Sequence, residues 1–271
     1  MAATRSRAEP RWRSIARGLL DTLIPLIILA AIWQGSVWIA GMPPKLFPPV
    51  EAIVERGFAL ATNGVLWMHL SATLARLLFG FLLAAVIGVL IGLAMGRSRR
   101  VEAFCLPLLS VLMPIPPLAW VPLFILWFGL GNMPTILLVA FAASVPIAST
   151  VWTGVRSVNE VWIRAAAIMG VEGREAFRKV VLPGSMPSVL SGLRLGMGRA
   201  WPAVVAGEMI AGTQSGLGWM IFASREFLST DVMFVGIGMV GLVGLFLERV
   251  VFQTLETRTL KRWGLVSEGA S

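Results

Sequence analysis

The longest uncharged stretch of the chain is the feature that most limits how it can fold. Residues Ala103 to Val155 include no Asp, Glu, Lys or Arg. A helix needs about 20 apolar residues to cross the hydrocarbon core of a bilayer, so this stretch suits two spans. Residues 129–134, Gly-Leu-Gly-Asn-Met-Pro, are the natural reversal point, because Gly and Pro interrupt helices. We predict that the first of the two spans is kinked or broken at its prolines, which are Pro107, Pro114, Pro116, Pro117 and Pro122.

The composition agrees with a membrane protein. The chain has 271 residues, of which 57% are hydrophobic and only 14% are charged, whereas soluble domains average about a quarter charged. The single Cys105 excludes an intramolecular disulfide and a multi-cysteine zinc site, and the single His69 excludes paired-histidine metal centres. We therefore predict neither a metal nor a cofactor. The net charge of +9 does not indicate nucleic-acid binding, because the basic residues lie at the ends of apolar runs.

Four further apolar segments bring the predicted number of spans to six. They are Leu19–Ala40, His69–Met95, Val189–Ala211 and Val232–Phe252. We expect a basic N-terminal segment over residues 1–18, one transmembrane domain over 19–255 with a loop at 156–188, and a tail over 256–271. The sequence thus predicts an all-α, multi-pass integral membrane protein.

The orientation follows from where Lys and Arg lie. They gather before the first span, between the second and third, between the fourth and fifth, and after the sixth, whereas the opposite loops carry only Lys45, Arg56 and Arg225. The positive-inside rule then places both termini and the 156–188 loop in the cytoplasm. Two ladders of small residues favour close helix packing; they are Gly80, Ala84, Gly88, Gly92 and Gly96, and Gly192, Gly196 and Ala200.

The loop between Arg156 and Ser188 is too polar for the lipid core and too regular for a plain linker. Its apolar residues follow helical spacing: Val158, Val161, Trp162, Ala165 and Met169. This spacing predicts a short amphipathic helix, which Gly170 is suited to end because glycine accepts the left-handed backbone of helix C-caps. We expect a second short helix to start near Glu172 or Gly173 and to stop before Pro183.

The loop resembles a motif of one transporter family. Ala165-Ala166, three residues, Gly170, nine residues, and Val180-x-Leu182-Pro183 have the spacing of the "EAA loop" of ABC-importer inner-membrane permeases. The wider sequence is similar to the nitrate, sulfonate, taurine and bicarbonate branch of that family. The matching segments include Leu46-Phe47-Pro48-Pro49, His69-Leu70-Ser71, Gly198-Arg199-Ala200-Trp201, Glu208-Met209-Ile210 and Ser215-Gly216-Leu217-Gly218.

The resemblance implies a fold, a set of partners and a set of site residues. The fold would be the type I ABC-importer (MetI-like) transmembrane domain, in the inner membrane of a bacterium. The partners would be a second permease copy in a homodimer, two cytoplasmic ATPase subunits, an external substrate-binding protein and the surrounding lipid bilayer. The ATPase-coupling residues would be Arg164, Ala165, Ala166, Gly170, Val180, Leu182 and Pro183.

One residue of the loop departs from the family pattern. Arg164 stands where the pattern has Glu. The partner ATPase then presents an acid, or Glu160 takes the acidic role, or Arg164 stays solvated; the sequence leaves these open. The other reading of the whole loop is an amphipathic helix lying on the membrane surface.

Charges inside the predicted spans are functional candidates, because they are costly unless paired or wet. Arg76 and Glu208 both fall in the outer part of the bilayer and lean toward the small-residue faces of their helices. We hypothesise that they approach one another as a packing pair or an outer gate; otherwise each snorkels separately to the interface. Arg199 is a third candidate for the pathway or gate.

The sequence also bears on enzyme activity. It contains no Gly-x-x-x-x-Gly-Lys-Ser/Thr, so it has no P-loop to bind ATP phosphates. It also offers no nucleophile with a base, since His69 is expected to be a satisfied interfacial residue. We therefore predict a permease rather than an enzyme, and the resemblance implies that it carries a small anion. A secondary transporter or channel that works without an ATPase is the alternative.

Overall fold

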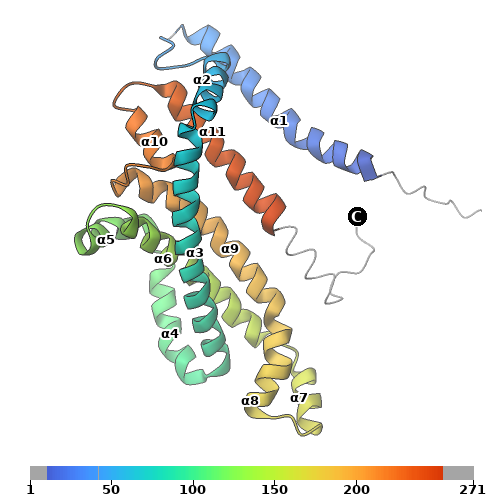
Figure 1. The fold of residues 1–271 in the computed structure, drawn as a ribbon. Coiled ribbons are helices and arrows are strands. Elements are labelled where there is room, and N and C mark those ends of the chain that lie inside the picture. Colours follow the sequence, from blue (N-terminus) through green and yellow to red (C-terminus); the bar gives the residue numbers. More distant parts are fainter. Residues whose placement is uncertain (1–10, 42, 253–271) are drawn as a thin grey trace, which may run out of the picture.

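A computed structural model describes residues 11–41 and 43–252, and all regular structure in these ranges is helical (Figure 1). The helices are α1 (Arg11–Ala40), α2 (Val50–Thr62), α3 (Val65–Arg97), α4 (Arg99–Leu112), η1 (Pro117–Trp120), α5 (Val121–Phe128), α6 (Asn132–Arg156), α7 (Glu160–Ile168), α8 (Gly173–Ala176), η2 (Phe177–Val181), α9 (Leu182–Ile210), α10 (Leu217–Ser224), α11 (Thr230–Phe246) and η3 (Leu247–Phe252). The predicted 1–18 segment lies partly, and the 256–271 tail wholly, outside the described residues.

Helices α3, α6 and α9 form the core of the molecule, and the predicted small-residue ladders explain how closely they pack. A Cβ atom on Gly80 would lie 2.6 Å from Val139 Cβ on α6, and one on Gly92 would lie 2.6 Å from Val151 Cβ. On α9, a Cβ on Gly196 would lie 2.5 Å from Ile147 Cγ1. Any larger side chain would push these helices apart, so the ladders set the helix spacing.

The proline-rich segment is broken, as predicted. Helix α4 and the η1–α5 segment meet at an angle of 94° after Leu112. Pro116 and Pro117 open the new segment, where a proline ring has no preceding helical turn to clash with. The predicted reversal is also confirmed, since α5 ends at Phe128 and α6 begins at Asn132.

The prediction of a helix break before Pro183 is wrong. We expected a break before Pro183, but the helical path continues from α8 through η2 into α9. The reason is that η2 is a π-helical turn, in which Leu182 N–H bonds to the carbonyl of Phe177, five residues back. The wider turn leaves room for the Pro183 ring, which has no N–H to contribute. Helix α9 therefore begins seven positions before the predicted span at Val189.

Length and composition single out three described helices that can each cross a membrane: α3, α6 and the α11–η3 segment over Thr230–Arg249. The bent pair Arg99–Leu112 and Pro117–Phe128 adds a fourth if it counts as one span. Helix α1 has a shorter apolar part over Ile27–Ile39, and α9 is long but carries charged residues. The chain is thus an all-α membrane protein, while the count of six spans stays a prediction.

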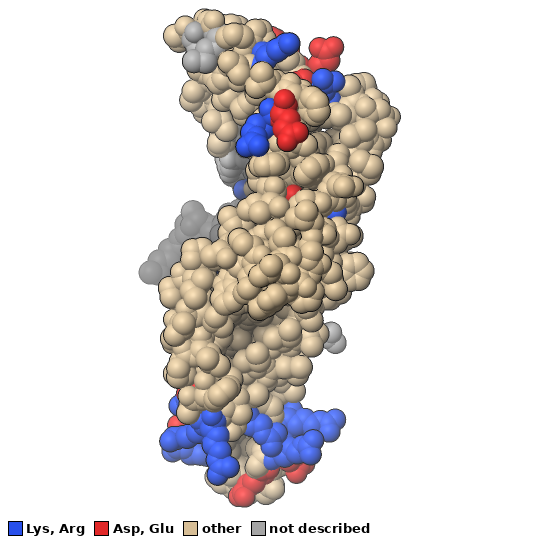
Figure 2. Space-filling view, turned by 90° about the vertical axis from the view of Figure 1, so that its left-hand side faces the viewer, with Lys and Arg blue, Asp and Glu red and all other residues tan. Residues whose placement is uncertain are grey.

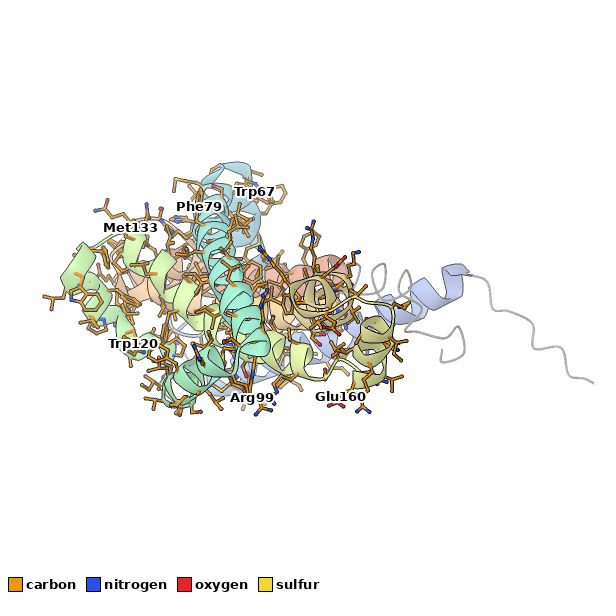
Figure 3. The ribbon with its side chains drawn as sticks, turned by 90° about the horizontal axis from the view of Figure 1, so that it is seen from below. Trp67, Phe79, Arg99, Trp120, Met133 and Glu160 are labelled. Atoms are coloured by element: carbon orange, nitrogen blue, oxygen red, sulfur yellow. The ribbon has the colours of Figure 1, made fainter. Side chains whose placement is uncertain are left out.

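Charged side chains gather at the two ends of the molecule (Figure 2). One end is mainly basic and the opposite end carries both signs, with few charges on the face between them. The basic end includes the termini of α3 and α6 and the α8–η2 segment, with Arg97, Arg99, Arg156, Arg174, Arg178 and Lys179. Seen from this end, Arg99 and Glu160 lie near the viewer, while Trp67 and Phe79 point outward from α3 (Figure 3).

The predicted orientation can be tested with single cysteines in a Cys105-free background. Arg174→Cys lies at the basic end and Glu226→Cys at the opposite end, and both positions are exposed. An impermeant thiol reagent added to intact cells should label position 226 and not position 174. Labelling of position 174 from outside would reverse the orientation.

Candidate functional site

The short helix α7 has defined ends. The side chain of Asn159 accepts a hydrogen bond from Val161 N–H at 2.9 Å, which caps the first turn. After Met169 the chain turns through Gly170, whose φ of 79° lies in the left-handed region that favours glycine. The predicted amphipathic helix and its glycine stop are therefore confirmed.

One face of α7 exposes apolar side chains. Val161, Trp162, Ala165, Ile168 and Met169 lie within about a third of the helix circumference at 100° per residue. Ile168 is 88% exposed and Met169 is 75% exposed. The helix lies at the tip of the basic end of the molecule, beyond the ends of α3 and α6 (Figure 1). This exposed apolar face is suited to contact another surface.

Beside α7 lies a cavity of about 450 Å³ that brings most of the predicted loop residues together. Ala165 and Ala166 line it from α7, and Val180 and Pro183 line it from η2 and the start of α9. Leu182 lies apart, on a neighbouring cavity lined by Arg97 and Arg178 among others. Gly170 belongs to neither lining. The two halves of the loop motif thus meet in space although η2 lies some distance along the chain from α7.

Arg164 forms an ion pair with Glu160, one turn earlier on α7. The side chains of Arg164 and Glu160 are 75% and 77% exposed. The pair brings together two of the residues that the sequence left as alternatives, and it neutralises both charges on this edge of α7. An exposed pair of this kind contributes only about 0.3–0.5 kcal/mol to stability, so a partner surface can readily separate it.

At the opposite end, the structure brings Arg76 and Glu208 together. Arg76 Nη1 lies 2.6 Å from Glu208 Oε1, and the two side chains are 6% and 0% exposed. The hypothesised pairing of these two charges is therefore confirmed, and separate snorkelling is not what the structure shows. Their assignment to a pathway or gate stays a prediction.

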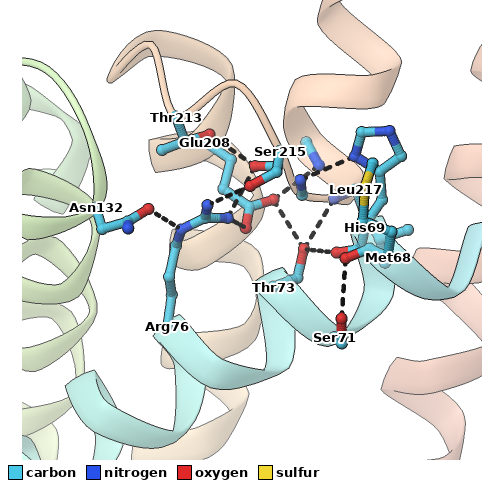
Figure 4. A network of polar contacts seen from close by, with 12 residues as sticks. Met68, His69, Ser71, Thr73, Arg76, Asn132, Glu208, Thr213, Ser215 and Leu217 are labelled. Carbon is cyan, nitrogen blue, oxygen red and sulfur yellow. Dashed lines mark hydrogen bonds and ion pairs between the residues drawn. The ribbon is translucent and has the colours of Figure 1, made fainter. Parts of the chain in front are cut away.

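The surrounding groups satisfy both charges (Figure 4). Arg76 Nε donates to Asn132 Oδ1 at 2.8 Å, and its two terminal nitrogens donate to the carbonyl and the hydroxyl of Ser215, each at 2.8 Å. Glu208 Oε2 accepts from Thr73 Oγ1 and from Gly218 N–H, each at 2.9 Å. The cluster therefore joins α3, α6, α9 and the loop before α10.

The sequence singled out only the two charges of this cluster. Thr73, Asn132 and Ser215 were missed, because ordinary polar residues carry no spacing signal. His69 is buried, and its Nδ1 accepts a hydrogen bond from Gly216 N–H at 3.0 Å, so it is the satisfied residue that we expected. Segments 69–71 and 215–218 were the available signal, since the structure brings them into contact beside the ion pair, where Gly216 N–H donates to His69 and Arg76 donates to Ser215.

The loop before α10 requires glycine at position 216. Its φ is 117°, and a Cβ there would lie 2.3 Å from the Glu208 carboxyl carbon. We expect Gly216→Ala to displace the carboxylate and to lower the thermal stability of the purified protein by several degrees. Gly131→Ala is the matched control, because Gly131 has a φ of 129° with nothing within 4 Å of the added Cβ. Equal melting temperatures for the two variants would contradict this account.

Arg199, the third predicted charge, is not part of this cluster. It lies on α9 with an exposed side chain and lines two separate cavities of about 90 and 460 Å³.

Comparison with known proteins decides the family. A family model described as "Binding-protein-dependent transport system inner membrane component" matches residues 84–260. The chain belongs to this family. This permease is 35% identical over 247 residues to the taurine transport system permease protein TauC of Escherichia coli (strain K12), a match that covers 89% of each chain. It is also 35% identical to the putative aliphatic sulfonates transport permease protein SsuC of Bacillus subtilis (strain 168), over 91% of this chain and 88% of that one.

Solved structures show the same fold for this permease. A chain of an amino acid ABC transporter matches with a TM-score of 0.62 at 16% identity, covering 74% of this permease and 96% of that chain. A chain of the MetNI methionine ABC transporter matches with a TM-score of 0.53 at 19% identity, covering 68% and 92%. The fold is that of type I ABC-importer transmembrane domains, and the permease is a transmembrane transport protein rather than an enzyme.

Proposed function

We propose that this permease forms, as a homodimer, the translocation pathway of an ATP-driven importer in a bacterial inner membrane. Two separate cytoplasmic ATPase subunits would supply the energy, and an external binding protein would deliver the solute. The solute would be a small anion, such as a sulfonate, taurine, nitrate or bicarbonate. The names of the two relatives above support the sulfonate end of this range.

The observation that carries the ATPase contact is the exposed apolar face of α7. Trp162, Ile168 and Met169 are exposed at the end of the molecule rather than along its lipid-facing sides. Apolar groups in that position are stabilised by burial against a protein partner. Ala165 beside them is small and exposed, so a partner surface can approach the backbone of α7 closely there, whereas Ala166 is buried within the chain.

The path from α7 toward the bilayer supports a mechanical connection. The cavity beside α7 is closed on its other side by η2 and the first turn of α9, through Val180 and Pro183. Arg97, at the end of α3, lies over the ring of Phe177 in η2 at 5.3 Å from its centroid. A displacement of α7 by a partner would therefore act on the ends of two core helices, α9 and α3.

The test is reconstitution of the permease in proteoliposomes with its ATPase and its binding protein. The binding protein is added outside the vesicles, and ATP is enclosed inside them. Uptake of a labelled sulfonate should require this ATP, and it should cease when a non-hydrolysable ATP analogue replaces it. Uptake that runs equally well without the ATPase subunits would overturn the proposal and favour a secondary transporter.

A further inference from the structure

Arg199 is an arginine of α9 that lies at mid-membrane depth. It shares a cavity with Phe141, Val145 and Pro146, which lie in the middle of the membrane-spanning helix α6. Within residues 11–41 and 43–252, the structure gives its guanidinium no ion pair or hydrogen bond, whereas Arg76 is paired with Glu208 and Arg194 with Glu248. A charge inside a membrane protein is costly unless it is paired or wet, so its position needs a functional reason.

The face of α9 that carries Arg199 differs from the lipid-facing surface of α3. Helix α3 exposes large apolar side chains, namely Leu78, Phe79, Leu82, Val86 and Leu90. Helix α9 exposes a stripe at helical spacing that contains Ser191, Leu195, Gly198, Arg199 and Pro202. Apart from Leu195, this stripe is small, polar or charged, and small residues at helical spacing are typical of helix–helix contacts in membranes, so the stripe suits a second helix or a water-filled space rather than lipid.

Arg199 stands between two cavities of opposite character. The smaller one, of about 90 Å³, is otherwise lined only by apolar residues, among them Leu112, Met113 and Phe141. The larger one, of about 460 Å³, is lined by Ser191, Arg194 and Glu248 among others. In the larger cavity the charge of Arg194 is already matched by Glu248 at 2.5 Å. The uncompensated charge at the junction of the two cavities is therefore that of Arg199.

We propose that Arg199 is a contact for the transported solute, and that this solute is an anion carrying a short apolar group. The guanidinium would bind the oxygens of a sulfonate on the polar side, because its fork of donors matches an oxyanion. The small apolar cavity would take the short alkyl group. This inference rests on the proposed function, since it concerns what passes through the pathway.

The experiment uses the reconstituted importer with methanesulfonate and butanesulfonate as probes. Arg199→Gln should lower ATP-driven uptake of both by about tenfold, the effect of losing one charge-assisted contact, while binding-protein-stimulated ATP hydrolysis stays within twofold of wild type. Arg199→Lys should retain at least a third of the uptake. Arg225→Gln is the control. It removes one positive charge from an exposed arginine that lies over the ring of Phe222, away from both cavities, and it should leave uptake unchanged.

A second variant tests the apolar cavity. Val145→Phe adds bulk to the lining and should reduce butanesulfonate uptake at least fivefold more than methanesulfonate uptake. Because the binding protein is the same throughout, the ratio of variant to wild type isolates the permease. If the wild type takes up the probes and Arg199→Gln does so equally well, the Arg199 proposal is wrong while the proposed function stands. The same holds if Arg199→Lys and Arg199→Gln lose uptake equally. Absence of any ATP-driven uptake by the wild type would count against the proposed function.

Discussion

Replacing Gly170 by Leu is expected to uncouple ATP hydrolysis from uptake while the protein still inserts into the membrane. A leucine at a φ of 79° is strained by about 1–2 kcal/mol. A Cβ at this position has nothing within 4 Å in the chain itself. The expected effect therefore comes from a displaced C-terminus of α7 and from a clash with the partner surface. We expect uptake to fall at least tenfold while the ATPase rate stays measurable, as read from both rates in one proteoliposome preparation.

The control for Gly170→Leu separates strain from position. Gly64, at the start of α3, has a φ of 81° and also has nothing within 4 Å of an added Cβ. Gly64→Leu imposes the same backbone strain at the opposite end of the molecule, so it should leave the ratio of uptake to hydrolysis unchanged. Gly170→Asn should be milder than Gly170→Leu, since Asn tolerates the left-handed region. Equal uncoupling by Gly64→Leu and Gly170→Leu would remove Gly170 from the ATPase contact.

Removing Glu208 is expected to be the most destabilising single change in the outer part of the molecule. Glu208→Ala leaves the guanidinium of Arg76 buried without its counter-charge, a loss of about 3–5 kcal/mol in typical buried pairs. It also leaves the N–H of Gly218 without its acceptor. We expect low protein levels and an early melting transition in detergent. Glu51→Ala on α2, an exposed carboxylate, is the control and should behave as wild type.

The double variant and the charge swap give different results because the cluster is not symmetric. Arg76→Ala combined with Glu208→Ala should be less harmful than the sum of the single changes, because neither charge is left alone. The swap of Arg76→Glu with Glu208→Arg should fail. The glutamate would face the Ser215 carbonyl, and the arginine would face the N–H of Gly218. A swap that restores wild-type stability would show that the hydrogen bonds around the pair contribute little.

Much of the fold could be predicted because it follows from local chemistry. The uncharged stretch, the proline break after α4 and the glycine stop of α7 each depend on a few neighbouring residues. The continuation through Pro183 could not be predicted, because it depends on a π-helical turn whose fifth-residue hydrogen bond has no sequence signature. The span at Val189–Ala211 was predicted despite its charges, but α9, which carries them, is not among the helices that length and composition single out, so the count of six spans stays a prediction.

Some residues of the candidate sites could likewise be predicted from the sequence, and others could not. Arg76 and Glu208 could be paired from the sequence because charges in apolar helices are rare and their depths agreed. Thr73, Asn132 and Ser215 could not, because each is an ordinary residue until the fold brings four segments together. Arg199 could be named from the resemblance, but its isolation from other charges depends on which way each face of α9 points.

The π-helical turn η2 has a geometric consequence for everything beyond it. From Gly173 to Ile210 the chain is one uninterrupted helical path, and each residue advances the direction of the side chains by about 100°. The turn adds one residue to an otherwise α-helical count, so it sets the angular phase between α8 at the base and Arg199 at mid-depth. Deleting or inserting a single residue between Leu182 and Arg199, in the α-helical part of this path, would rotate Arg199 away from its cavities and turn Glu208 away from Arg76. The number of residues between these points is constrained separately from their identity.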